Sequence, residues 1–265
     1  MSLGLAAVCA LGFASSAMAH SFTASRLPKP LSEAEPGKTH GLGIEGEITG
    51  EHNQVFRFGA FEIYCGAKGY ANTPAEGAVT WATSQTLSTE IKFTKCLTKA
   101  HFSSVVAGLR TAFNVNPETK KSEPLKFVYH VNGFAEFGSG ETESEVEVGG
   151  GAAAFSIAGK VCKISWPAQT VPVKAIKHPE EEFSSAVYSN KFVPTGPHSA
   201  KQFPSGEQER LVIANNFKSM KWSYEEGQCL GEGGFEEEAK TTEGKGATYE
   251  GTLEEWVQGG NLGFE

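Results

Sequence analysis

The stretch that decides the fold is GKVCKISWPAQ, at residues 159–169. Its expected partner is the stretch MKWSYEEGQC, at residues 220–229. Both contain the branched and aromatic residues that β-strands favour, and each has a cysteine near one end. We therefore predict that the two strands lie together and that Cys162 and Cys229 form a disulfide, which fixes the core of the C-terminal half.

The N-terminus has the features of a secretory signal peptide, at residues 1–19. Residues 3–14 form an apolar run that is rich in Ala and Gly rather than in strand formers, and AMA at residues 17–19 matches an A-x-A cleavage site. The usual basic segment is missing, because Arg26 is the first basic residue. We predict a secreted protein, extracellular or at the cell surface, whose mature chain begins at His20. No other stretch reaches the ~18 apolar residues that a membrane span needs.

Four cysteines remain after this cleavage, and they are Cys65, Cys96, Cys162 and Cys229. An even number in an exported chain favours two disulfides, and four cysteines allow three connectivities. We predict Cys65–Cys96 and Cys162–Cys229, since each pair then closes a loop within one half of the chain. There is no C-x-x-C, and no His has zinc-finger spacing from a cysteine pair, so we do not expect a zinc site.

Strand-like alternation of apolar and polar residues recurs along the chain, whereas no segment predicts a helix of more than two turns. Residues 105–112 could form a short helix, but Gly108 weakens that interpretation. The pattern therefore predicts an all-β protein. The main expected strands are 41–49, 55–65, 86–95, 125–137, 142–148, 152–166, 171–176, 183–188, 211–224, 235–242 and 247–257.

The predicted architecture is a set of antiparallel sheets in two packed, β-sandwich-like modules that disulfides staple. An extended, proline-bearing leader at residues 20–40 precedes an N-terminal module at 41–132 and a C-terminal module at 133–265. Both halves have a phenylalanine seven residues before a cysteine, which suggests related modules. One continuous sandwich is the alternative, because no linker is long enough to force the halves apart.

Composition excludes several functions. The chain has 265 residues and a net charge of −8, which disfavours a general affinity for nucleic acid or for anionic membranes. All 31 acidic residues are Glu, so there is no Asp-rich calcium loop, no aspartic-protease dyad and no triad that uses Asp. The G-x-S-x-G and H-E-x-x-H motifs are also missing from the sequence.

Carboxylate pairs are a candidate for glycoside hydrolysis, which needs two carboxyls about 5 to 9 Å apart. Glutamates recur at residues 143–147 and 236–238, but alternating or charged runs are typical of a solvated strand face. The run HPEEE at residues 178–182 resembles a metal site, yet Pro179 prevents the helix that would place its ligands on one face. We predict solvent-facing carboxylates in all three runs.

Tryptophans could stack on sugar rings, but a tryptophan in a strand is more often part of the core. We expect Trp166 and Trp222 to lie in the core and Trp256 to pack inward from the last strand. Trp81 stays without an assignment.

Several short motifs occur along the chain, and they are CxIxxPxQ at residues 162–169, YSN at 188–190, KWSY at 221–224, FxIxC at 61–65, ExKxxKC at 90–96 and, more weakly, TYEGT at 248–252. In these motifs the chain resembles a family of secreted, β-rich, uncharacterised proteins that are abundant in soil actinobacteria of the Thermoleophilia type. Where many members have a cysteine after Asn-Gly, this chain has Phe134, and the partner cysteine is missing too. The resemblance implies a secreted β-protein and no particular chemistry.

These observations favour a non-catalytic extracellular protein without a cofactor. It would be a cell-envelope component or a binding module, and its partner would be an unknown glycan or protein rather than nucleic acid. The alternative is a copper-binding protein or polysaccharide monooxygenase, because His20 at a mature N-terminus offers an α-amino group and an imidazole together. Cu(II) favours such tetragonal nitrogen ligands. The second imidazole of this histidine brace would come from His40, His52, His101, His130, His178 or His198.

Overall fold

The computed structural model describes residues 20–26, 42–46, 53–59, 61–72, 82–102, 105–131, 142–157, 159–175, 183–194, 207–224, 246–257 and 260–265. The elements in this part of the chain are all strands, which confirms the predicted all-β class. Their bounds are β1 Phe22–Arg26, β2 Leu42–Gly46, β3 Gln54–Phe58, β4 Phe61–Asn72, β5 Ala82–Ser84, β6 Thr86–Phe102, β7 Val105–Phe113, β8 Leu125–Val131, β9 Thr142–Val148, β10 Gly151–Ile157, β11 Lys160–Trp166, β12 Gln169–Ala175, β13 Ser185–Pro194, β14 Glu207–Met220, β15 Ser223–Tyr224, β16 Ala247–Val257 and β17 Gly260–Phe264.

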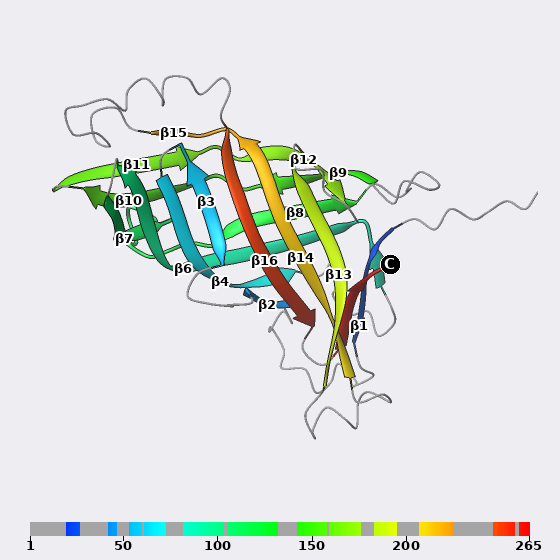
Figure 1. The fold of residues 1–265 in the computed structure, drawn as a ribbon. Coiled ribbons are helices and arrows are strands. Elements are labelled where there is room, and N and C mark those ends of the chain that lie inside the picture. The colour runs from blue at the N-terminus through cyan, green and yellow to red at the C-terminus, as the bar shows by residue number, and fades with distance from the viewer. Residues whose placement is uncertain are drawn as a thin grey trace, which may run out of the picture.

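The large sheet closes on itself (Figure 1). From β6 the strands follow in the order β8, β9, β12, β13, β14 and β16. Next come β2 and β3, which lie one after the other between β16 and β4, and β4 then returns to β6. All of these pairs are antiparallel except β12–β13, which is a short parallel pair. Closure leaves one continuous interior, to which every second residue of each strand points.

The sheet forks at β6, which is 17 residues long. One edge of β6 pairs with β4, whereas the other edge pairs with β8 over residues 86–91 and with β7 over residues 97–102. From β7 the sheet continues through β10 and β11 to β15, outside the closed ring. The pair β11–β15 joins Ile164 to Tyr224 and Ser165 to Ser223, so the two stretches that decide the fold do lie together.

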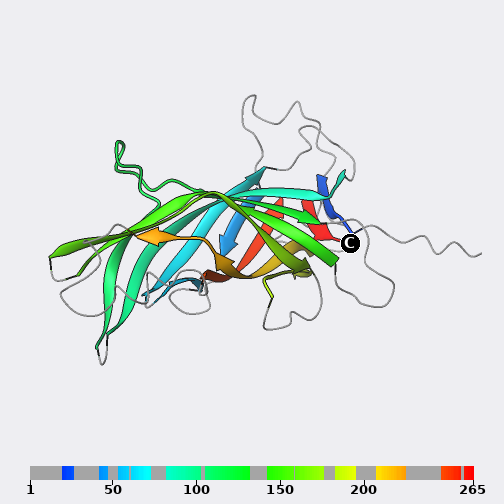
Figure 2. The same cartoon turned by 90° about the horizontal axis from the view of Figure 1, so that it is seen from above.

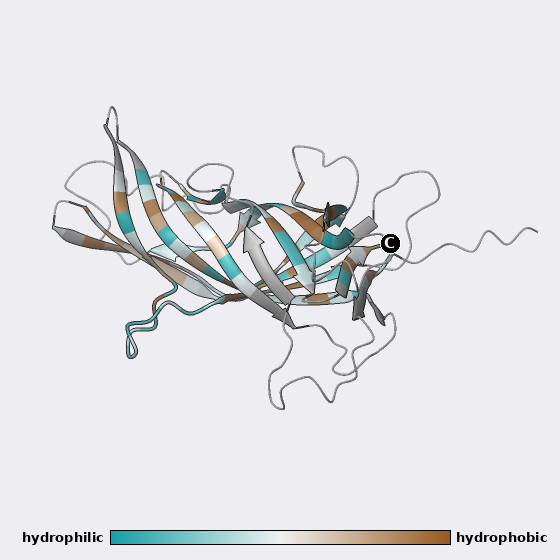
Figure 3. Ribbon diagram, turned by 90° about the horizontal axis from the view of Figure 1, so that it is seen from below, coloured by the Kyte–Doolittle hydropathy of each residue, from teal (hydrophilic) through white to brown (hydrophobic). Residues whose placement is uncertain are grey.

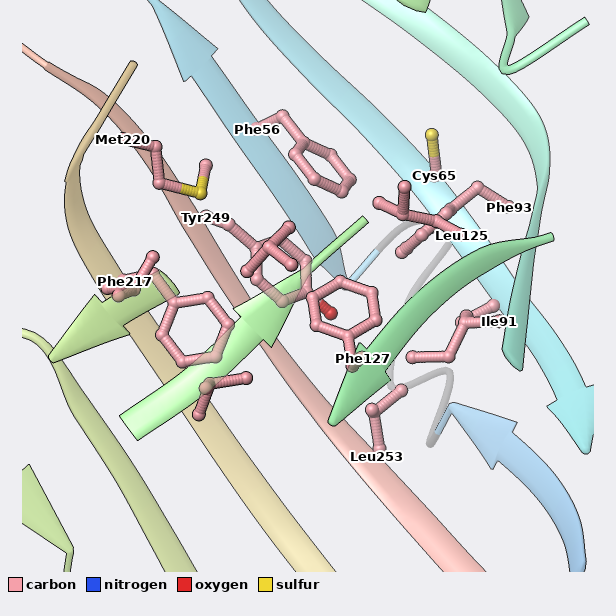
Figure 4. Packing of buried hydrophobic residues seen from close by; sticks show 14 of the residues in the cluster. Phe56, Cys65, Ile91, Phe93, Leu125, Phe127, Phe217, Met220, Tyr249 and Leu253 are labelled. Carbon is pink, nitrogen blue, oxygen red and sulfur yellow. The ribbon is translucent and has the colours of Figure 1, made fainter. Parts of the chain in front are cut away.

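The interior is lined by large, buried aromatic and aliphatic side chains. Hydrophobic and hydrophilic residues alternate along several strands, as the bands of colour in Figure 3 show. Tyr249 lies at its centre, with ring centroids 4.5 Å from Phe56, 5.6 Å from Phe127 and 5.6 Å from Phe217 (Figure 4). Aromatic contacts continue from Phe56 to Trp166 of β11, in the extension that β7, β10, β11 and β15 form outside the ring. One aromatic core therefore serves both the closed ring and the extension.

A second sheet of three strands, β17-β1-β5, packs against one end of the ring beside the C-terminus (Figure 2). Five residue pairs join β1 to β17, and the Phe22 ring of β1 lies 5.1 Å from Tyr188 and 5.4 Å from Phe264. We call β1, β5 and β17 the end sheet. The first part of the predicted leader is thus its middle strand, while residues 27–41 lie outside the described part.

The predicted disulfide Cys65–Cys96 is confirmed, and it joins the neighbouring strands β4 and β6. It lies where the β4–β6 register shifts between Tyr64 and Gly66, and where Lys95 has a positive φ of 52°. Cys162 is buried and also disulfide-bonded. Its predicted partner Cys229 lies outside the described residues, so that pairing stays a prediction.

Two strand predictions were wrong in their extent, and a segment that could have formed a short helix is a strand. The strands expected at residues 55–65 and 152–166 are each a hairpin, because Gly59 and Gly159 adopt φ values of +57° and +80° at the turns. Two-residue hairpin turns need such positive φ angles, and glycine adopts them without strain. The short helix considered at residues 105–112 is strand β7, which pairs with β6 on one side and β10 on the other.

Strands from both predicted modules belong to the large sheet. β8 pairs with β9 and β7 pairs with β10, so hydrogen-bonded neighbours lie on both sides of the boundary expected at residues 132 and 133. β2, β3 and β4 of the first half also close the ring against β16 of the second half. The large sheet therefore continues across this boundary.

Candidate functional site

The residues singled out by sequence lie in different parts of the structure. The His20 imidazole stacks on Phe264, with ring centroids 5.6 Å apart, and its Nδ1 lies 3.3 Å from the Glu265 carbonyl oxygen. The neighbouring Ser21 exchanges two backbone hydrogen bonds with Glu265. Residue 20 is therefore fixed to the end sheet.

Only one of the proposed second copper ligands has a described side chain. That ligand is His130 of β8, whose Nε2 lies 3.0 Å from a carboxylate oxygen of Glu147. The described residues contain no group of three or more His, Cys or Glu that could hold a metal ion. The imidazoles of His40, His52, His101, His178 and His198 lie outside the described side chains.

The tryptophan and glutamate predictions are confirmed in part. Trp166 is buried, and Trp222 packs against the core with its ring 5.7 Å from Phe58. The glutamates at 145 and 147 are exposed, as expected for a solvated strand face, whereas 236–238 and 178–182 lie outside the described part. Trp256, however, does not point inward: it lies on the outer face of β16, under the Arg210 guanidinium at 4.7 Å.

The parity of β16 places a different residue in the interior. Tyr249, Leu253 and Glu255 are fully buried on one face of this strand, while Glu254 and Trp256 belong to the other face. The carboxyl of Glu255 therefore enters the closed ring. Since Glu255 pairs with Leu211 on one side and Ile44 on the other, it is held in the middle of the sheet and not at an edge.

Glu255 is accompanied by other buried polar side chains, which we call the polar cluster. Its members come from four strands of the ring, and they are Tyr129 of β8, Tyr188 of β13, Asn215 of β14, and Tyr249 and Glu255 of β16. The Tyr129 and Tyr188 rings meet edge to face at 6.1 Å. Tyr188 also contacts Phe22 and Phe264, so the cluster extends to the end sheet.

Most polar atoms of the cluster lack a hydrogen-bond partner in the described part of the protein. These atoms are both carboxyl oxygens of Glu255, the hydroxyls of Tyr129 and Tyr188, and the amide nitrogen and oxygen of Asn215. A buried polar group without a partner costs about 1 to 3 kcal/mol, and native proteins contain few of them. Their concentration in one region therefore requires an explanation.

Burial controls the protonation of this cluster. Desolvation raises the pKa of Glu255 well above its ordinary value, because no neighbouring cation offsets the loss of water. Desolvation also raises the pKa values of Tyr129, Tyr188 and Tyr249, and the nearby Glu255 carboxyl adds to each rise. Burial thus favours the neutral form of each of these groups, and a protonated carboxyl can donate one hydrogen bond.

One side of the cluster is well satisfied. The Tyr249 hydroxyl donates to Gln54 Oε1 over 2.5 Å, and Gln54 Nε2 donates to the Thr252 carbonyl over 2.8 Å. Gly251 makes this possible, since a Cβ at that position would overlap the Gln54 side chain. The Asn215 amide lies close enough to Tyr129 and Tyr249 to offset part of the rise in both phenol pKa values, although it is not within hydrogen-bond geometry of either.

The adjacent Glu254 shows how this chain satisfies a carboxylate. Its two oxygens accept hydrogen bonds from Lys191 Nζ at 2.8 Å and Arg210 Nη1 at 2.6 Å on the outer face. Partial burial opposes ionisation, but these two cations outweigh it and lower the pKa of Glu254. Two neighbouring glutamates therefore have opposite environments, one paired with two cations and one with none.

Comparisons with known proteins found no match to this chain. No family model matches the chain, no curated protein matches it, and no solved structure matches it. Among the described residues there is no helix of the length and hydropathy that a membrane crossing requires.

Proposed function

We propose that the protein is a secreted, non-catalytic binding protein that holds a small ligand inside its closed sheet, at the polar cluster. The observation that carries this proposal is the set of unpartnered polar atoms on Tyr129, Tyr188, Asn215 and Glu255. A ligand that exchanged hydrogen bonds with them would remove the free-energy cost of their burial. Binding sites of this kind combine apolar and aromatic walls with a few convergent polar groups.

A binding role agrees better with the cluster than catalysis does. A glycosidase of the ordinary type needs two carboxyls facing each other, and Glu255 is the one carboxylic acid among the buried interior residues described. The neighbouring Glu254 points away from the cluster and is occupied by two cations. The ligand could be a small molecule or the end of an extracellular glycan.

Export is part of the same proposal. It is supported by the signal-like residues 1–19, by the resemblance to secreted β-rich proteins, and by disulfide bonding, which persists in oxidising compartments. We expect cleavage after Ala19 and a second disulfide between Cys162 and Cys229. Each half of the chain, 41–132 and 133–265, would then carry its own disulfide staple.

Native mass spectrometry of the mature protein, purified from culture medium without denaturants, tests the binding proposal. We expect a co-purified small molecule, or a small molecule acquired from a metabolite mixture, that is lost in Tyr188→Phe and Glu255→Gln variants. A glycan array run with the same protein decides whether the ligand is a sugar. The proposal is wrong if no small molecule or glycan binds and an experimental structure shows only water bonded to the polar cluster.

The copper alternative retains one supporting observation. His20 is fixed to the end sheet through Ser21, Phe264 and Glu265, so a metal at the mature N-terminus would have a rigid first ligand. Copper titration followed by electron paramagnetic resonance tests it. A dissociation constant weaker than micromolar, or one that His20→Ala does not change, would eliminate this alternative.

A further inference from the structure

The polar cluster combines an acidic group and neutral polar groups with no basic group among its described residues. It contains a carboxyl group, three phenols and one amide, but the buried residues that the structure describes include no Lys, Arg or His. From this imbalance we infer that the ligand of the closed sheet is an organic cation, an amine or ammonium compound whose charged group docks on the Glu255 carboxylate. The inference rests on the proposed binding function and specifies the class of its ligand.

Charge complementarity is the first reason. A carboxyl in a low-dielectric interior ionises only when a cation is brought close to it. On the outer face of the same strand the chain provides Lys191 and Arg210 for Glu254. Inside the ring it provides no described cation for Glu255, so a ligand can supply the missing charge.

The walls of the cluster are the second reason. Cations are attracted to the faces of aromatic rings within about 6 Å of the ring centroid, and the attraction strengthens when water is excluded. Tyr129 and Tyr188 meet edge to face at 6.1 Å, and the Glu255 carboxyl is near enough to raise the pKa of both phenols. Phe22 and Phe264 also pack against Tyr188. A small ammonium group next to Glu255 would therefore lie close to aromatic rings.

The hydrogen-bonding groups are the third reason. An ammonium group has only donors, and it needs acceptors such as the carboxylate of Glu255, the Asn215 Oδ1 and the hydroxyl oxygens of Tyr129 and Tyr188. All of these atoms lack partners in the described part of the protein. An anionic ligand would find no opposite charge, because the buried residues that the structure describes include no Lys, Arg or His.

Binding of a cation must be linked to release of a proton. Burial without a cation raises the pKa of the Glu255 carboxyl and so favours its protonated form in the free protein. When an ammonium group binds, the carboxyl gives its proton to solvent and an ion pair forms, so the net charge of the site is unchanged. At pH values below the pKa of Glu255 in the free protein, the affinity should rise about tenfold per pH unit.

Three molecules of similar shape and different charge test this inference: benzylammonium, benzyl alcohol and benzoate. Their binding to the mature protein is measured by calorimetry at pH 6 and pH 7, in two buffers with different ionisation enthalpies. We expect preferred binding of benzylammonium, with release of up to one proton and an affinity that rises with pH. Glu255→Gln should abolish the proton release and weaken benzylammonium binding at least tenfold. Glu254→Gln, on the outer face, should leave the proton release and the affinity unchanged.

Results that contradict the cationic ligand can be distinguished from results that contradict the binding function. Equal binding of benzyl alcohol, or benzylammonium binding without proton release, overturns the cationic ligand but leaves the proposed binding function standing. Failure of benzylammonium to bind also overturns the cationic ligand, and the native mass spectrum then decides separately whether any molecule occupies the ring. Since Gln is neutral and nearly isosteric with protonated Glu, Glu255→Gln should fold, and the buffer dependence in the unmodified protein is an independent measurement.

Discussion

Two adjacent glutamates of β16 should give opposite responses of stability to pH. Glu255 points into the ring and has a raised pKa, whereas Glu254 points outward and has a lowered pKa. The perturbation is Glu255→Gln, with Glu254→Gln as its matched control one residue away. Both substitutions remove one ionisable carboxyl and keep the size of the side chain.

The sign and the magnitude follow from proton linkage. In the unfolded chain the Glu255 carboxyl ionises with a pKa of about 4.3, while in the folded protein it keeps its proton to a higher pH. Its contribution to stability is therefore complete below pH 4.3 and is lost as the pH rises toward the folded pKa. Within that window the loss is about 1.4 kcal/mol per pH unit.

Chemical denaturation at several pH values between 5 and 8 measures this effect. Relative to the unmodified protein, Glu255→Gln should become more stable by about 1.4 kcal/mol for each unit of rising pH, up to the folded pKa. Glu254→Gln should instead be less stable near neutrality, and its deficit should shrink as the pH falls and the Glu254 carboxylate is protonated. If the difference in free energy of unfolding between Glu255→Gln and the unmodified protein does not change with pH, the Glu255 carboxyl is not held neutral by burial.

Three further predictions concern the frame around the polar cluster. Replacing Cys65 and Cys96 by serine should lower the free energy of unfolding by about 3 to 4 kcal/mol, because 30 residues separate the two cysteines; urea titration checks this, and no loss would contradict it. Gly251→Ala should push the Gln54 amide from its hydrogen bonds and cost about 1 to 3 kcal/mol by the same measurement, and an unchanged midpoint would count against that packing. Phe22→Ala should loosen the end sheet and speed amide hydrogen exchange in β1 and β17; unchanged exchange there would show that Phe22 does not hold this sheet in place.

Local patterns predicted most individual strands. The alternation at residues 142–148 predicts a strand with the bounds that β9 has, and the predicted solvent exposure is confirmed for Glu145 and Glu147. The stretches 159–169 and 220–229 do pair, through β11 and β15. Alternation succeeds here because the side-chain period of two depends only on which face of the strand is buried.

The hairpins and the closure of the sheet depend on information that alternation lacks. A turn of two residues preserves the alternating pattern on both sides, so one strand and a tight hairpin look alike around Gly59 and Gly159. Closure requires β4 to pair with β6 and β16 to pair with β2 and β3, which are contacts between distant parts of the sequence. No pattern within a single strand specifies such a partner.

The polar cluster was missed for a related reason. The expectation that Trp256 packs inward assigned the wrong parity to β16. It was made because tryptophan is more apolar than the neighbouring Glu255, which is the residue that points inward. The positions of Tyr249 and Leu253 provide a better signal, since both are apolar and share the parity of Glu255. Counting from them would have placed a glutamate in the core, and a buried Glu is rare enough to identify the site from sequence.

Carbon-13 NMR of the Glu255 side-chain carboxyl shows whether it is protonated in the free protein and ionises when a cation binds inside the closed sheet. The resonance is assigned by its loss in Glu255→Gln and followed at pH 6 as benzylammonium is added to the mature protein. Our account predicts the chemical shift of a protonated carboxyl in the free protein and that of a carboxylate in the complex. A carboxyl that is already ionised in the free protein, or one that stays protonated when benzylammonium is bound, would contradict it.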